Sequence, residues 1–122
     1  MLAIFATLAL AAAAPPAGSL PKEVKVVGGA FHTQTGDPLY TFRNDTMFGM
    51  SHCFGACAVA WPPLIAHDPP PAAPAPEWTL VTREPGVKQW AYRDKPLYRA
   101  NVSVERVEAA VKDGMWIPAK PQ

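Results

Sequence analysis

The sequence predicts a mainly β fold: a small single domain of two related β-hairpin units in a pseudo-twofold arrangement, with one or two short helices. The main observation is a phrase that occurs twice, as Asp37-Pro38-Leu39-Tyr40 and as Asp94-Lys95-Pro96-Leu97-Tyr98. Each copy is followed by a tryptophan that leads into proline, in Trp61-Pro62-Pro63 and in Trp116-Ile117-Pro118. A phrase repeated in the same order at similar spacing indicates one supersecondary unit used twice.

The two units are expected at about residues 25–66 and 78–120, inside a single domain that spans residues 19–122. Between the units, residues 68–77 are rich in proline, which disfavours both helix and central strand. We therefore expect an extended connector there. A mature chain of this size has room for one domain with a modest core.

Strand patterns and turn residues place one hairpin in each unit. In the first unit, residues 30–33 and 39–42 are expected to pair around a turn. In the second unit, residues 89–92 and 97–99 are expected to pair in the same way. Both return strands open at a proline, a position where proline costs no hydrogen bond of the ladder.

Three further elements complete the predicted fold. A weak strand at residues 24–26 ends at a glycine pair, and another strand is expected at residues 78–81. Residues 104–111 carry valines at helical spacing, Ser103 can cap the N-terminus of this helix, and Gly114 can end it.

The start of the sequence indicates export. The first charged residue is Lys22, and an apolar run over residues 2–10 is followed by alanines that offer small-residue cleavage sites. The run is too short for a permanent span, which needs roughly twenty apolar residues. We expect residues 1–18 to be a signal peptide and the mature protein to be periplasmic or secreted, without a membrane span. A disordered tail rich in alanine and proline is the alternative.

Cys53 and Cys57 are the two cysteines of the chain, and in an exported protein they are expected to form a disulfide. Residues four apart in a regular helix hold their Cβ atoms about 5–6 Å apart, whereas a disulfide needs about 3.8 Å. Cys53 is therefore expected in irregular backbone, with a short helix that begins near Gly55.

The segment Tyr40-Thr41-Phe42-Arg43-Asn44-Asp45 resembles the motif Y-x-[FWY]-x-x-D, after which a bacterial family of secreted proteins and lipoproteins is named. The resemblance covers roughly residues 25–120 and implies a secreted-repeat domain of the envelope, from a family of uncharacterised function. The resemblance extends to the paired cysteines, Trp61-Pro62-Pro63, Gln89-Trp90-Ala91-Tyr92 and Pro96-Leu97-Tyr98. The predicted motif-site residues are Tyr40, Phe42, Asp45, Trp61, Tyr98 and Trp116. The second copy lacks the later aromatic residue and the aspartate, so two equivalent tyrosine–aspartate sites are not expected.

Asp45 is expected to accept backbone N–H bonds and to fix the turn that follows it. Four other residues are candidate metal ligands: Met47, Met50, His52 and His67. Thioether and imidazole groups suit copper, above all Cu(I), or an axial position of haem. In the alternative interpretation, the methionines fill gaps in the core, the histidines lie at the surface and the cysteines are purely structural.

No motif of a hydrolase, a nucleotide-binding loop or a zinc protease occurs in the sequence, and we expect no enzyme. Eleven basic residues balance ten acidic ones, which argues against nucleic acid as a partner. Most of the four tryptophans and three tyrosines are expected in the core, whereas an exposed aromatic stripe would indicate glycan or protein binding.

The sequence thus predicts a monomeric, non-catalytic envelope module for binding or accessory tasks, with an envelope protein or a glycan as partner. The alternative is a periplasmic copper- or haem-binding protein in metal handling or electron transfer.

Overall fold

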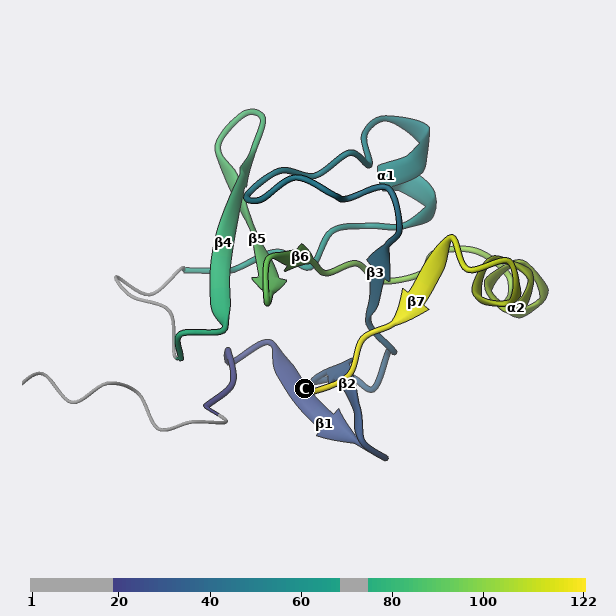
Figure 1. Cartoon of the computed structure of the whole chain (residues 1–122), viewed down its shortest axis with the longest axis horizontal. Helices are drawn as coiled ribbons and strands as arrows, with labels where there is room; N and C mark the ends of the chain where they lie inside the picture. The colour runs from purple at the N-terminus through teal and green to yellow at the C-terminus, as the bar shows by residue number, and fades with distance from the viewer. Residues whose placement is uncertain (1–18, 69–74) are drawn as a thin grey trace, which may run out of the picture.

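The computed structural model describes residues 19–68 and 75–122 and shows a mainly β fold with short strands and two short helices (Figure 1). The predicted signal peptide, residues 1–18, and residues 69–74 of the predicted connector lie outside the described residues. In chain order the elements are β1 (Val24–Val27), β2 (Ala30–Thr33), β3 (Tyr40–Phe42), α1 (Ala56–Ala60), β4 (Trp78–Arg83), β5 (Val87–Tyr92), β6 (Lys95–Pro96), α2 (Val104–Lys112) and β7 (Trp116–Pro118).

The first hairpin differs from the predicted one. β2 forms its ladder with β1 across Gly28 and Gly29, whose φ angles of 58° and 77° are the left-handed values that a tight two-residue turn requires. On its other edge, β2 also meets the predicted return strand: the N–H of Thr33 bonds the carbonyl of Asp37 over 2.8 Å, His32 bridges Pro38, and the N–H of Leu39 bonds the carbonyl of Phe31 over 3.0 Å. The predicted hairpin is therefore present but short, because residues 40–42 leave β2 and pair with β7 instead.

The second hairpin is confirmed. β4, β5 and β6 form an antiparallel sheet of three strands, in which β5 and β6 join around Arg93 and Asp94. Both turn residues have positive φ, 47° and 66°. The return strand is shorter than predicted. Its pairing with β5 nevertheless extends beyond β6, since the N–H of Leu97 bonds the carbonyl of Trp90 over 2.9 Å. The strand predicted at residues 78–81 is the first part of β4.

The two copies of the repeated phrase meet through their tyrosines. The N–H of Tyr40 bonds the carbonyl of Tyr98 and the N–H of Tyr98 bonds the carbonyl of Tyr40, both over 2.9 Å. Tyr40 also pairs with Pro118 in β7, and Tyr98 pairs with Pro63. Each tryptophan–proline segment therefore joins the hairpin of the other unit, and the predicted twofold relation between the units stays a prediction.

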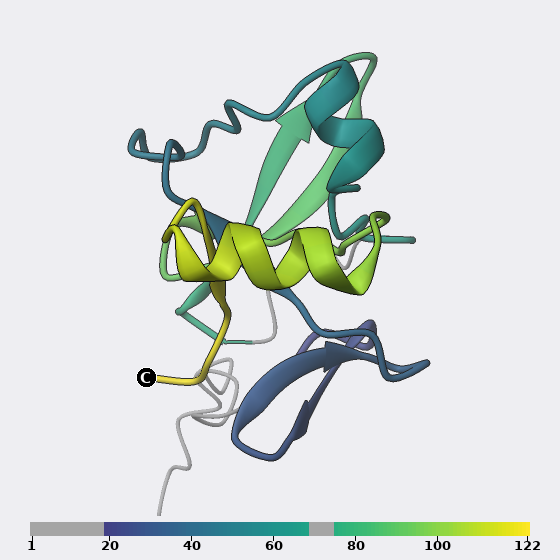
Figure 2. The ribbon, with the colours of Figure 1, turned by 90° about the vertical axis from the view of Figure 1, so that its right-hand side faces the viewer.

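Both helices lie where the sequence placed them (Figure 2). α1 begins directly after Gly55, and α2 begins after Ser103, whose hydroxyl accepts the N–H of Arg106 over 3.3 Å. Beyond α2, Gly114 has a φ of 80°, a value that favours glycine. Among residues 19–68 and 75–122, none of the helices is long and apolar enough for a membrane crossing.

The interior contains two apolar clusters. One lies between the β1–β2 hairpin and the β4–β5–β6 sheet and contains Phe31, Trp78, Trp90 and Tyr92. The other lies where β3 and β7 meet the two helices. All four tryptophans and all three tyrosines are buried, which confirms the expectation for the core and leaves no tryptophan or tyrosine for an exposed stripe.

Candidate functional site

The motif residues come together in the second cluster, at the junction of β3 and β7. β3 supplies Tyr40 and Phe42, and β7 supplies Trp116. Trp116 lies between two stacked rings: the Phe42 centroid is 4.4 Å away and the Trp61 centroid is 4.1 Å away, with interplanar angles of 17° and 8°. Tyr98 meets Trp116 edge-on at 5.1 Å. Five of the six motif residues thus form one aromatic core, which stabilises the contact between the two halves of the chain.

Asp45, the sixth motif residue, is buried with only 2% exposed surface and binds two distant parts of the chain. One carboxylate oxygen accepts the Tyr98 hydroxyl over 2.5 Å, and the other accepts the backbone N–H of His52 over 2.6 Å. The second bond confirms the predicted role of Asp45 as an acceptor of backbone N–H groups. The first bond fixes the carboxylate to the other copy of the repeat.

A chain of buried polar groups continues from this pair to β4. The Ser51 hydroxyl lies 2.6 Å from the Tyr98 hydroxyl and accepts a guanidinium N–H of Arg83 over 2.6 Å. Arg83 also donates to the carbonyl of Cys53 over 2.6 Å and to the side chain of Gln89 over 3.1 Å. Within the described residues, every buried side-chain nitrogen and oxygen has a hydrogen-bond partner. The network therefore holds the loop before α1 against the β4–β5 hairpin.

Sequence reasoning did not find Ser51, Arg83 or Gln89. Arg83 and Gln89 lie in neighbouring strands, but Ser51 is 32 positions before Arg83 and the three residues share no motif. The available signal was Gln89 itself, a polar residue that is fully buried inside a strand otherwise expected to be apolar. A buried amide needs partners, so it marks a polar network in the core.

Burial and the neighbouring Asp45 disfavour loss of the Tyr98 proton. Burial, and then the hydrogen bond to Asp45, raise the pKa of Tyr98 far above its ordinary value of 10.0. Burial alone raises the pKa of Tyr40. Because Tyr98 has no exposed surface, a solute cannot reach its hydroxyl. The tyrosine–aspartate pair is thus arranged to stabilise the fold.

The structure joins Cys53 and Cys57 in the predicted disulfide, with Cα atoms 5.2 Å apart. Cys53 is fully buried in irregular backbone before Gly55, as expected, and Cys57 lies within α1. Both sulfurs are thereby bonded to each other, so the cysteines do not act as thiolate ligands in this state.

The four candidate metal ligands do not form one group. Met47, Met50 and His52 lie in the exposed loop between β3 and α1, and the N–H of Met50 bonds the carbonyl of Met47 over 3.3 Å. His67 lies elsewhere, beside Glu23 in a surface pocket. Met47 and Met50 have 54% and 46% of their surface exposed, so the interpretation that they fill the core is wrong. Among residues 19–68 and 75–122, no three or more His, Cys, Asp or Glu side chains gather as a metal site.

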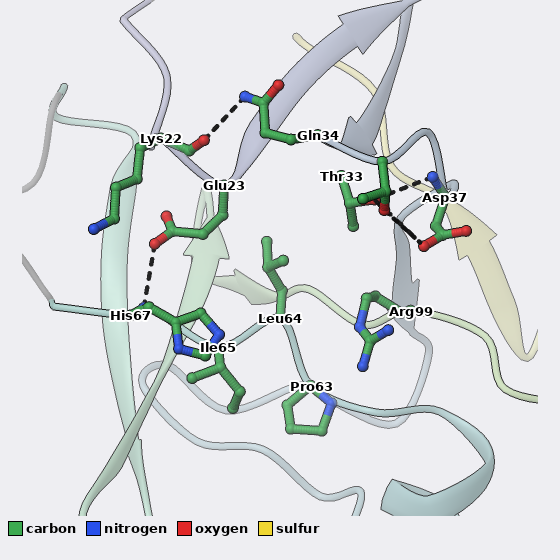
Figure 3. Close-up of a pocket in the computed structure, with 11 residues that line it drawn as sticks. Lys22, Glu23, Thr33, Gln34, Asp37, Pro63, Leu64, Ile65, His67 and Arg99 are labelled. Carbon is green, nitrogen blue, oxygen red and sulfur yellow. Dashed lines mark hydrogen bonds between the residues drawn. The ribbon is translucent and has the colours of Figure 1, made fainter.

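That surface pocket is open, with a volume of about 430 Å³, and lies between the first hairpin and the segment that follows Trp61 (Figure 3). Figure 3 shows His67 and Arg99 on opposite sides, with Leu64 between them. The lining residues are Lys22, Glu23, Thr33, Gln34, Thr35, Asp37, Pro63, Leu64, Ile65, His67 and Arg99.

The acidic side chains of the pocket are already engaged. Glu23 accepts the backbone N–H of His67 over 3.2 Å and the indole N–H of Trp90 over 2.8 Å. Asp37 accepts the hydroxyl of Thr35 over 3.2 Å. In the part of the chain that the structure describes, the side-chain nitrogens of Lys22 and Arg99 donate to no protein group, which leaves cationic groups available in the pocket.

The first unit of the chain is similar to a known protein family. Residues 26–65 match a family described as a secreted repeat of unknown function. The match contains the first repeated phrase, the Y-x-[FWY]-x-x-D motif, the cysteine pair and Trp61. The predicted resemblance is therefore confirmed for this secreted repeat, and for residues 66–120 it stays a prediction. The family's description agrees with an extracellular or envelope location. No curated protein and no solved structure shows a significant match to the chain.

Proposed function

We propose that the protein is a non-catalytic binding module of the bacterial envelope, periplasmic or secreted, whose pocket beside β2 holds a carboxylate of a partner protein. The observation that carries the proposal is the charge arrangement of this pocket. Its carboxylates accept hydrogen bonds from the protein itself, whereas Arg99, on the side opposite Lys22 and Glu23, keeps its guanidinium donors for a ligand (Figure 3). An arginine is suited to a carboxylate, which it binds through charge-assisted hydrogen bonds.

A partner protein fits this pocket better than a glycan. Sugar rings are commonly held against exposed aromatic faces, and the pocket has no aromatic side chain among its lining residues. Its floor is apolar, formed by Pro63, Leu64 and Ile65. An acidic side chain could place its methylene groups on this floor and its carboxylate against Arg99.

The burial of the one tyrosine–aspartate pair supports a non-catalytic role. A general acid or base must come within hydrogen-bond reach of the substrate. Tyr98 is fully buried and Asp45 is 2% exposed, and the hydrogen bonds of both groups end on other protein groups.

The binding proposal is tested by titrating isotope-labelled protein with N-acetyl-glutamate amide and, separately, with the neutral N-acetyl-glutamine amide. We expect the glutamate probe to shift the amide resonances of residues 34–37 and 64–67, and the glutamine probe to leave them unchanged. Arg99→Gln should abolish the shifts, whereas Arg106→Gln on exposed α2 serves as the matched control and should preserve them. Equal shifts with both probes, or unchanged shifts in Arg99→Gln, would contradict the proposal.

We also propose that the two units are related by an approximate twofold axis near the Tyr40–Tyr98 pair. Matched hydrogen bonds support it: the N–H of Leu64 bonds the carbonyl of Leu97 over 2.8 Å, and the N–H of Ala119 bonds the carbonyl of Leu39 over 2.9 Å. Each pair joins the residue three positions after one tryptophan to the leucine of the other unit's phrase.

A second matched set lies one strand further out. The N–H of Trp90 bonds the carbonyl of Leu64, and the N–H of Phe31 bonds the carbonyl of Ala119, each over 2.9 Å. In a crystal structure, the backbones of residues 30–61 and 88–116 should superpose as strand, turn and tryptophan units. A crystal structure without the reciprocal Tyr40–Tyr98 hydrogen bonds, or in which the two segments do not superpose, would overturn this relation.

A further inference from the structure

The loop between β3 and α1 exposes side chains that are usually buried. Met47 and Met50 have 54% and 46% of their surface in solvent, and His52 is also exposed. Methionine is among the residues most often buried in folded proteins. Because these two methionines do not contribute to the core, their thioethers are available to a ligand that approaches from solvent.

The backbone of this loop brings the Cα atoms of the two methionines near each other. The hydrogen bond from Met50 N to the carbonyl of Met47, 3.3 Å long, closes a four-residue turn with Gly49 at a φ of 70°. In such a turn the first and last Cα atoms lie within about 7 Å of each other. Methionine side chains are unbranched and flexible, so both sulfurs can reach one ion.

The backbone of the loop is held in place at His52, the third candidate ligand. The backbone N–H of His52 bonds the buried carboxylate of Asp45 over 2.6 Å, and the next residue, Cys53, is held by the disulfide and by Arg83. The imidazole thus extends from a rigid backbone position two residues after Met50. Because of this anchoring, the loop loses less conformational entropy when it binds a ligand.

We propose that Met47, Met50 and His52 form a surface binding site for one Cu(I) ion. Thioethers are soft, neutral ligands that select Cu(I), and imidazole also binds copper well. The cysteines are bonded to each other and the carboxylate of Asp45 is buried and doubly hydrogen-bonded, so neither competes for the ion. Hard cations such as Ca²⁺ and Mg²⁺ prefer several oxygen ligands, which the three side chains do not offer. His67 is not part of this site, because it lies in the separate pocket.

The test is an anaerobic competition between the oxidised protein and the Cu(I) chelator bicinchoninate, read by the absorbance of the chelator complex. Even outer partners of metal ligands change affinity about tenfold or more, so Met47→Leu/Met50→Leu should weaken copper binding by at least that factor. His52→Ala should weaken it as well. Met115→Leu and His32→Ala, which remove a methionine and a histidine elsewhere, are the matched controls and should bind copper as the wild type does.

A second measurement identifies the ligands directly. Ag(I), a redox-inert substitute for Cu(I), is added to protein with labelled methionine methyl groups. The methyl resonances of Met47 and Met50 should shift, and that of Met115 should not. Absence of these shifts, or equal copper retention by the wild type and Met47→Leu/Met50→Leu, would overturn the site. The same double variant should still bind the glutamate probe, so failure of the copper site and failure of the carboxylate pocket are distinguishable.

Discussion

Asp45 connects the family motif to the second copy of the repeat. Its carboxylate accepts one bond from the loop that it precedes and one from Tyr98, which lies in the other unit. The Y-x-[FWY]-x-x-D segment, residues 40–45, therefore has two structural roles. Phe42 stacks on Trp116 and Tyr40 meets Trp61 edge-on, while the aspartate accepts the buried hydroxyl of Tyr98.

Replacement of Asp45 by alanine should strongly destabilise the protein. It would leave the Tyr98 hydroxyl and the His52 N–H without their acceptor, and hydrogen bonds to charged groups contribute about 1.5–3 kcal/mol each. We expect the free energy of unfolding in urea to fall by about 2–4 kcal/mol. Glu108→Ala, at an exposed position of α2, is the control and should change it by less than about 0.5 kcal/mol. A similar small effect of Asp45→Ala would show that the bonds do not contribute.

Tyr98 makes stability depend on alkaline pH. Its pKa is raised in the folded protein from 10.0, so above about pH 10 the unfolded chain loses this proton while the folded protein keeps it. The contribution of Tyr98 to the free energy of unfolding is fully present below about pH 10. Above that pH it falls by up to about 1.4 kcal/mol per pH unit. Tyr98→Phe should make the fall between about pH 10 and pH 11 shallower, with the contribution of Tyr40 remaining. Urea unfolding at several pH values measures this fall in the free energy of unfolding. An identical dependence on pH in the wild type and in Tyr98→Phe would show that Tyr98 is not its source.

At the scale of elements, local signals predicted α1, α2, β1 and most of the β4–β5–β6 sheet. Ser103, Gly114 and the glycine pair at residues 28–29 each act through their own backbone, so their positions were readable in the sequence. The partner of a strand is not a local property. Two turn signals flank β2 and both turns form, but only the tertiary structure decides that the longer ladder is with β1 and that β3 leaves β2 to pair with β7. The Ser51–Arg83–Gln89 network depends on the same long-range pairing.

The disulfide should contribute to local order more than to overall stability. It closes a loop of only a few residues, and the loop-closure formula gives about 2 kcal/mol for such a loop. We expect Cys53→Ser to lower the free energy of unfolding by roughly 1–3 kcal/mol without abolishing the fold. Reduction of the wild type should have a similar effect. Mass spectrometry of exported, unreduced protein should show the chain two hydrogens lighter than its thiol form, and free thiols at both positions would contradict the bond.

At the scale of the whole molecule, the two halves of the chain depend on each other for their hydrogen bonds. β7 is paired with β3, and the segment after Trp61 is bonded to Leu97 and Trp90. The aromatic stack likewise takes Phe42 and Trp61 from one half and Trp116 from the other. Neither half contains a complete set of partners for its own strands.

This dependence predicts that residues 19–68 and 75–122, produced as separate fragments, do not fold alone. Each fragment would leave strand N–H and carbonyl groups unpaired, and each exposed large apolar side chain would cost about 1.5–3 kcal/mol of lost burial. Near-ultraviolet circular dichroism of the tryptophans and the dispersion of amide resonances should be lost in each fragment, with the intact chain as reference. Mixing the fragments should restore part of both signals, because the missing partners are then supplied. Native-like dispersion of the amide resonances in one isolated fragment would contradict this prediction, because that unit would then fold without the other. The interlocked arrangement would in that case result from docking between two independent hairpins.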